Sequence, residues 1–252
     1  MTGGRQAGVS PASGWLAGAD GCRAGWVVAL VRPQGDEVRL RVVPHFADID
    51  AAEQPDLIAV DMPIGLPDRI GPVGRGPEQA VRPLLGGRQS SVFSVPSRAA
   101  VYAADYREAC RIALATSDPP RMMSKQLHMI AGKIREVDGL LRAEAALAAR
   151  VFEVHPEVAF WRLNGERALD EPKKVKGIPY GPGLALRRRL LIAAGFPAEV
   201  VAMAPPRGAA ADDVVDALAC AAIARRLHAG LAQPFPATPG RDAHGLPIAI
   251  WA

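Results

Sequence analysis

Several features that the 252-residue sequence lacks narrow its class. It has no run of eighteen apolar residues, so we expect no membrane-spanning helix. Aromatic residues make up only 5% of the chain and no long basic block is present, so no platform for stacking single-stranded bases is visible. The cysteines Cys22, Cys110 and Cys220 are too far apart for a zinc motif or a disulfide framework, which favours a reducing compartment.

The composition that is present is typical of a globular protein. Residues 1–13 are small and polar without the apolar middle of a secretory signal, which predicts a disordered tail and a cytoplasmic protein. We expect a single domain over residues 14–252. The net charge of +4 is compatible with nucleic-acid binding but does not require it.

The stretch Gly14 to Leu30 predicts a strand, a tight turn and a second strand, and residues 37–43 alternate as a third, half-buried strand. Asp20 lies where the first apolar run ends. A carboxylate leaving a buried strand is costly unless a cation meets it. The alternative, that Asp20 caps backbone donors in a turn, is the more common role of an isolated aspartate.

A second acid lies in the same kind of position. Residues 57–60 are wholly apolar, which is typical of a strand buried on both faces and parallel to a neighbour, and Asp61 follows directly. Ligands of open α/β sheets gather at the carboxyl ends of strands. Capping of the turn before Pro63 is an equally good structural explanation for Asp61.

The middle of the chain predicts a long loop and a helical insertion. Residues 70–97 are rich in glycine, proline and arginine, and loops of this length are usually lids, binding loops or disordered. Its arginines and serines could contact phosphates, or the loop could simply be solvated, with its arginines paired to surface carboxylates. Residues 98–115 and 124–149 predict two helices, which together form an insertion over about 98–149.

Three ionisable residues follow the insertion. Residues 151–155 predict a short strand, and Pro156 begins a helix. Glu153, His155 and Glu157 fall within five positions. A Glu–His pair of this kind is more often structural than catalytic, but the strand-to-helix junction favours a role in a site.

The last predicted helix, residues 209–229, begins with three acids. Capping of the helix N-terminus explains Asp212, and explains Asp213 less well. It does not explain Asp216, because an almost wholly apolar run follows that residue and places it toward the core.

Four of these carboxylates would repel one another if the fold brought them together: Asp20, Asp61, Asp213 and Asp216. Magnesium removes that penalty because it takes carboxylate oxygens as ligands. Two such ions about 4 Å apart can hold the attacking and leaving oxygens of a phosphodiester displacement. The sequence therefore predicts metal-assisted phosphoryl chemistry.

Seven motifs between about Gly18 and Trp251 carry a resemblance to known proteins: GADGCRAGW, AVDMPIGLP, LLGGRQSSVFSVPSR, KIREVD, VFEVHPEVAF, ADDVVDALA and DAHGLPIAIW. The order of elements resembles the ribonuclease H-like fold, and the first and last acidic motifs look like those of Holliday-junction resolvases. More closely, the chain resembles the family of domain of unknown function 429, whose members are described as predicted nucleases with that fold. One departure is Pro77-Glu78, where that family is expected to have Cys-Asp.

The resemblance implies an α/β fold with a ribonuclease H-like mixed sheet, three antiparallel strands followed by parallel strands, flanked by helices. It implies a nuclease that uses Mg²⁺ or Mn²⁺ to hydrolyse DNA or RNA. Asp20, Asp61 and Asp216 would be metal ligands, and Asp213 a ligand or a neighbour of one.

The same resemblance gives the residues after the insertion secondary roles. Glu153 or Glu157 would be an accessory carboxylate, and His155 would orient a water or a ligand. Two alternatives to a nuclease stay open: a phosphotransferase or hydrolase of a small phosphorylated ligand, and a non-catalytic binding protein.

Overall fold

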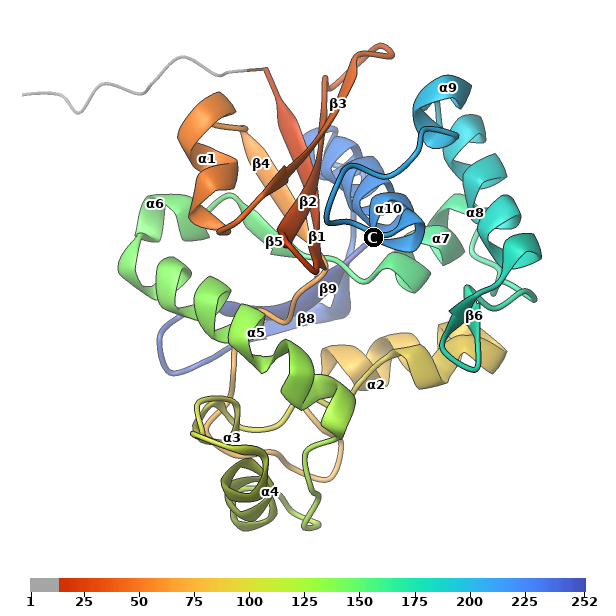
Figure 1. The fold of residues 1–252 in the computed structure, drawn as a ribbon. Coiled ribbons are helices and arrows are strands. Elements are labelled where there is room, and N and C mark those ends of the chain that lie inside the picture. The colour runs from red at the N-terminus through yellow and green to blue at the C-terminus, as the bar shows by residue number, and fades with distance from the viewer. Residues whose placement is uncertain (1–13) are drawn as a thin grey trace, which may run out of the picture.

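A five-stranded mixed sheet lies at the centre of the computed structural model, which describes residues 14–252 (Figure 1). The tail predicted for residues 1–13 lies outside the described residues. The strand order is β3-β2-β1-β4-β5, with β1, β2 and β3 antiparallel and β4 and β5 parallel to β1, which confirms the predicted mixed α/β sheet. The strands are β1 (Leu16–Cys22), β2 (Gly25–Val31), β3 (Val38–Val43), β4 (Leu57–Val60) and β5 (Val151–Glu153).

Helices cover both faces of this sheet (Figure 1). Helices α1 (Ala47–Glu53) and α5 (Lys125–Ala143) pack on one face, and α7 (Pro156–Leu163), α8 (Gly181–Ala193) and α10 (Ala211–His228) lie on the other. Every residue of β2 is buried because that strand has a helical layer on each side, so its sequence is apolar throughout rather than alternating.

Helix α10 lies unusually close to β1 at Gly18. A Cβ atom at this position would lie 2.1 Å from the backbone nitrogen of Ala221 and 2.2 Å from the carbonyl oxygen of Ala217. Only glycine allows this approach. The contact fixes the depth and position of α10 against the strand that carries Asp20.

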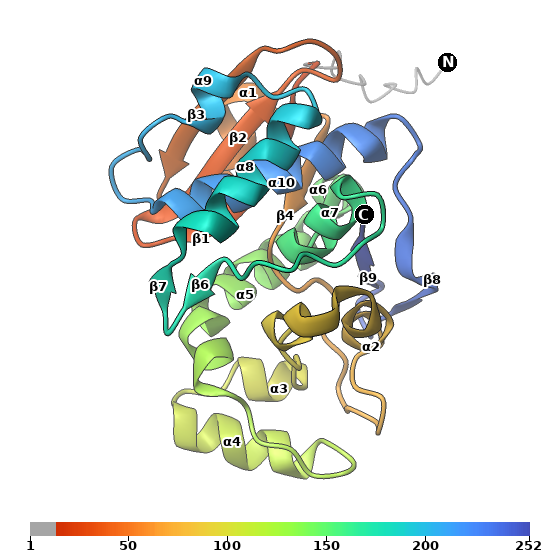
Figure 2. The same cartoon turned by 90° about the vertical axis from the view of Figure 1, so that its right-hand side faces the viewer.

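Residues 70–97 are not irregular throughout. They contain the short helix α2 (Pro77–Val81) and the 3-10 helix η1 (Arg82–Ser91), and Pro77 occupies the first turn, where its missing N–H costs nothing. The insertion is divided more finely than expected, because Asp105 caps a new helix by accepting a hydrogen bond from the backbone nitrogen of Glu108. Besides α5, the helices of the insertion are α3 (Arg98–Val101), α4 (Tyr106–Ala115), which Asp105 caps, and α6 (Ala145–Ala148). Figure 2 shows α3 and α4 projecting away from the sheet.

Two hairpins complete the described chain. The segment between α7 and α8 contains β6 (Lys174–Val175) and β7 (Ile178–Pro179), and the short helix α9 (Ala198–Val201) follows α8. The C-terminal strands β8 (Pro234–Arg241) and β9 (Pro247–Trp251) form a separate two-stranded sheet. Among the described residues, none of the helices combines the length and apolar character needed to cross a membrane.

Candidate metal centre

Three carboxylates from distant parts of the chain converge at one end of the sheet. Asp20 lies on β1, Asp61 directly follows β4, and Asp216 lies in the second turn of α10. One oxygen from each residue can be chosen so that all three oxygens lie within 4.8 Å of one another. The parallel pairing of β1 with β4 brings the first two acids together, and the Asp61 backbone nitrogen donates to the Ala19 carbonyl oxygen at 2.9 Å.

Burial makes the negative charge of these carboxylates costly. Burial, reinforced by repulsion from the other two acids, raises the pKa of Asp20 well above its ordinary value. Burial also raises the pKa of Asp61 to about 7 and the pKa of Asp216 to about 6, although in both cases the ammonium group of Lys173 opposes the change. The cluster therefore favours any species that neutralises it, either protons or a cation.

Lys173 belongs to a run of three lysines within residues 173–176, and such a run usually lies on a solvated surface, so the sequence does not predict this residue in the site. Here its ammonium group forms an ion pair with Asp216 Oδ2. Burial alone would lower the pKa of Lys173, but Asp216, Asp20 and Asp61 raise it above its ordinary value, so the lysine is charged. The lysine run itself was the only signal in the sequence that could have pointed to this role.

The donor set fits a hard divalent cation. Asp20, Asp61 and Asp216 offer only carboxylate oxygens, which Mg²⁺ and Mn²⁺ prefer. Oδ1 of Asp216 is buried and has no hydrogen-bond partner among the described residues, whereas Oδ2 is paired with Lys173. A buried carboxylate oxygen without a partner is rare in a folded protein, and a metal ion would satisfy it.

Asp213 is not part of this cluster. Its Oδ2 accepts a hydrogen bond from the backbone nitrogen of Ala210 at 2.8 Å, so it caps the N-terminus of α10. Asp212, which we expected to be the cap, instead pairs with Lys174 at 2.6 Å. The cap is therefore Asp213 and not Asp212, and neither of the two acids lies in the three-acid cluster.

The two glutamates near the junction of β5 and α7 are held by buried arginines. Glu153 Oε1 accepts from Arg75 Nη2 at 2.5 Å, and Glu157 accepts from Nη2 of Arg187 at 2.6 and 2.7 Å. Burial raises the pKa of Glu153 to about 7 although Arg75 opposes the change. These pairs fix segments of the fold around the site, and neither glutamate lies in the three-acid cluster.

His155 lies beside the cluster, and only one of its two ring nitrogens has a hydrogen-bond partner among the described residues. Its Nε2 is 3.3 Å from the carbonyl oxygen of Ser91, and its Nδ1 is buried without a partner among the described atoms. Burial lowers the pKa of His155, so the ring is neutral near pH 7.

The family model for proteins of unknown function named DUF429 matches residues 18–241. The chain belongs to the DUF429 family. The matched span includes all three acids of the cluster and Lys173. Searches of curated proteins and of solved structures gave no match.

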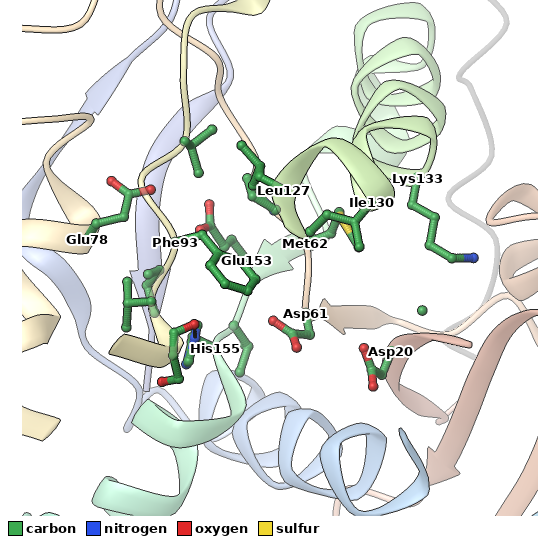
Figure 3. Close-up of a pocket in the computed structure, with 17 residues that line it drawn as sticks. Asp20, Asp61, Met62, Glu78, Phe93, Leu127, Ile130, Lys133, Glu153 and His155 are labelled. Carbon is green, nitrogen blue, oxygen red and sulfur yellow. Dashed lines mark hydrogen bonds between the residues drawn. The ribbon is translucent and has the colours of Figure 1, made fainter. Parts of the chain in front are cut away.

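Two adjoining cavities of this DUF429 chain meet at Asp20 and Asp61. The larger, of about 510 Å³, is also lined by Asp216, Arg88 and Lys173. The smaller, of about 220 Å³, extends from the two aspartates between largely apolar walls (Figure 3). An acidic centre with cations along its rim and an apolar recess beside it therefore opens to solvent at this end of the sheet.

The arginines of residues 70–97 and their neighbour Arg98 lie in different environments, and not all of them could contact a phosphate at the acidic cluster. Arg75 is buried against Glu153 and Glu78, and Arg98 binds Asp138 and Asp242. Arg88, with Ser90 and Ser91, lines the larger cavity, and so only this end of the segment faces the acidic cluster.

Proposed function

We propose that this chain is a divalent-metal-dependent nuclease with a ribonuclease H-like fold, which hydrolyses phosphodiester bonds of nucleic acid. The observation that carries the proposal is the convergence of Asp20, Asp61 and Asp216 within 4.8 Å from β1, the end of β4 and α10. The sheet order β3-β2-β1-β4-β5, with a C-terminal helix lying on β1, supports the assignment of the fold.

The charges around the cluster favour a single ion. Three carboxylates and the ammonium group of Lys173 leave two negative charges, which one Mg²⁺ or Mn²⁺ neutralises. Asp213, Glu153 and Glu157 are engaged elsewhere, so no fourth carboxylate is available to hold a second ion in the described arrangement. We therefore propose that one ion acts together with Lys173, in place of the two ions that the sequence suggested.

The proposed roles follow from these positions. Asp20, Asp61 and Asp216 hold the ion, which when bound polarises a phosphoryl oxygen and lowers the pKa of water. Lys173 provides a second positive charge at the same place, where negative charge develops during phosphoryl transfer. Neutral His155, with Nδ1 free, is the candidate to accept a proton from the attacking water.

The larger cavity is suited to a phosphate backbone. Arg88 and Lys174 line it together with Lys173, and positive groups flanking an acidic centre can hold phosphates on either side of the scissile one. The three cysteines are all buried and free, which fits the proposed cytoplasmic setting.

A cleavage assay with defined metal tests the proposal. Labelled single strands, duplexes and branched junctions of DNA and RNA are incubated with Mg²⁺ or Mn²⁺, with EDTA as the blank. We expect cleavage by the wild type, none by Asp20→Asn, and unchanged cleavage by Asp36→Asn, whose carboxyl lies in an exposed turn. Cleavage that survives Asp20→Asn would refute the assignment.

The same wild-type and variant proteins also distinguish the two alternatives to a nuclease, an enzyme for a small phosphorylated ligand and a non-catalytic binding protein. Hydrolysis of small phosphate esters without cleavage of any nucleic acid would indicate the small-ligand enzyme. Absence of all activity, together with no metal binding and a more stable Asp20→Asn variant, would indicate a binding protein whose acids serve no catalysis.

A further inference from the structure

The smaller cavity has an apolar middle and an acid at each end. Figure 3 shows Asp20 and Asp61 on one side and Glu78 on the other. Met62, Val95 and the α5 residues Leu127 and Ile130 are among the apolar side chains that line the space between them, with Phe93 beside them. The cavity thus reaches from the proposed catalytic centre to a carboxylate that the proposed mechanism does not use.

Glu78 is buried with an unused hydrogen-bond acceptor. The residue is 2% exposed; Oε1 accepts from Arg75 Nε at 2.8 Å, and Oε2 has no partner among the described atoms. Arg75 also binds Glu153, so one guanidinium group serves two carboxyl groups and Glu78 does not have a cation of its own. A buried acceptor of this kind is costly unless a donor from outside the described chain satisfies it.

The size of the cavity limits the occupant. Its volume of about 220 Å³ corresponds to roughly seven water molecules in the liquid, which is room for a single planar ring system and not for a base pair. Phe93 is 36% exposed and offers a ring beside the opening. Aromatic and apolar walls with a few buried polar groups are how proteins hold a base that has left its stack.

We propose that this cavity binds one unpaired nucleobase that carries an exocyclic amino group, which donates a hydrogen bond to Glu78 Oε2. This inference deepens the proposed nuclease function, because the phosphate of the same nucleotide then lies at Asp20 and Asp61. Adenine, cytosine and guanine each carry such an amino group, whereas the exocyclic positions of thymine carry only two carbonyl oxygens and a methyl group. The one donor of an unpaired thymine, its ring N3–H, lies between those two oxygens, which a carboxylate repels. The substrate is accordingly an unpaired nucleotide with one of those three bases.

Binding of mononucleotides tests the inference without any cleavage step. Titration calorimetry in Mg²⁺ compares dAMP, dCMP, dGMP and dTMP. At least one amino-bearing nucleotide should bind at least about tenfold more tightly than dTMP, since thymine lacks the exocyclic amino donor and its ring N3–H can approach Glu78 only together with two carbonyl oxygens. In Glu78→Gln the preference should shrink to about threefold or less, and Glu108→Gln, on α4 and outside the lining of the cavity, should retain it.

A second variant keeps the test independent of any folding defect in Glu78→Gln. Phe93→Ala should weaken binding of the preferred nucleotide by about tenfold, while Met129→Ala, on the exposed face of α5, should not. Equal binding of all four nucleotides, no binding of any, a preference that survives Glu78→Gln, or unchanged binding by Phe93→Ala would each overturn the inference.

Failure of this inference is distinguishable from failure of the proposed function. Metal-dependent cleavage that requires Asp20, without any base preference in the titrations, would refute the base site and leave the nuclease intact. A base preference that requires Glu78, in a protein that cleaves no nucleic acid, would support the base site and refute the nuclease.

Discussion

Replacing Asp61 by asparagine should stabilise the metal-free protein at about pH 8. Asp61 contributes an oxygen to a set that lies within 4.8 Å, together with oxygens of Asp20 and Asp216. Burial raises its pKa to about 7, with Lys173 opposing the change. Asparagine has nearly the same shape without the negative charge, so the substitution removes repulsion and leaves the packing unchanged.

The size and direction of the effect follow from the two pKa values. Asp61 titrates near 3.8 when unfolded and near 7 when folded, so between these values the folded state binds more protons. Stability therefore falls as the pH rises from 3.8 to 7 and stays lower above it. The full shift corresponds to about 4 kcal/mol. Because the carboxyl group is partly exposed and shares its charge effects with its neighbours, we expect about 2 kcal/mol.

Urea unfolding followed by tryptophan fluorescence measures this difference. In EDTA at about pH 8, Asp61→Asn should be more stable than the wild type, and at about pH 4 the two should be alike. Added Mg²⁺ should stabilise the wild type more than the variant, because only the wild type keeps all three carboxylate ligands. Asp36→Asn is the matched control. A variant that is less stable than the wild type in EDTA at the higher pH would refute the electrostatic reasoning.

Three further predictions concern the surroundings of the cluster. Lys173→Met should raise the affinity for Mn²⁺ by about tenfold or more, because it removes a competing cation, and calorimetry should show a much smaller change for Lys174→Met. Gly18→Ala should lower the free energy of unfolding by roughly 3 kcal/mol or more in thermal melts, since its Cβ would meet backbone atoms of α10. Arg187→Met should cost about 3–5 kcal/mol in urea unfolding because it leaves Glu157 as a buried unpaired charge.

The elements that could be predicted are those whose signals are local in the sequence. The apolar run of β4 and the alternation in β3 indicate how each strand is buried, and β1 and β2 are joined by a turn of only a few residues. The breaks inside the insertion were missed because Asp105 ends one apparent helix and caps the next. Residues 174–179 form a hairpin that could not be predicted from a periodic pattern, since its strands have only two residues each.

The position of a site residue could be predicted only where the direction of a strand fixes where the residue at its carboxyl end lies. Asp20 and Asp61 lie near the carboxyl ends of paired parallel strands, so the sheet necessarily places them together. The ion-pair partners of Glu153 and Glu157 could not be predicted in this way, because the arginines that bind them lie 78 and 30 residues away in the sequence. A sequence shows that an acid is present near a site, but only the packed fold shows that an arginine has already neutralised it.

Lys173 shows how the pairing of the surrounding charges defines the cluster. Around it, Arg187 holds Glu157 and Lys174 holds Asp212, so each of these two acids has its own cation, whereas Glu153 shares Arg75 with Glu78. The three converging aspartates share a single lysine that lies 43 residues from Asp216 in the sequence. When all three aspartates are ionised, the cluster therefore carries two uncompensated negative charges at one point, and they equal the charge of one divalent ion.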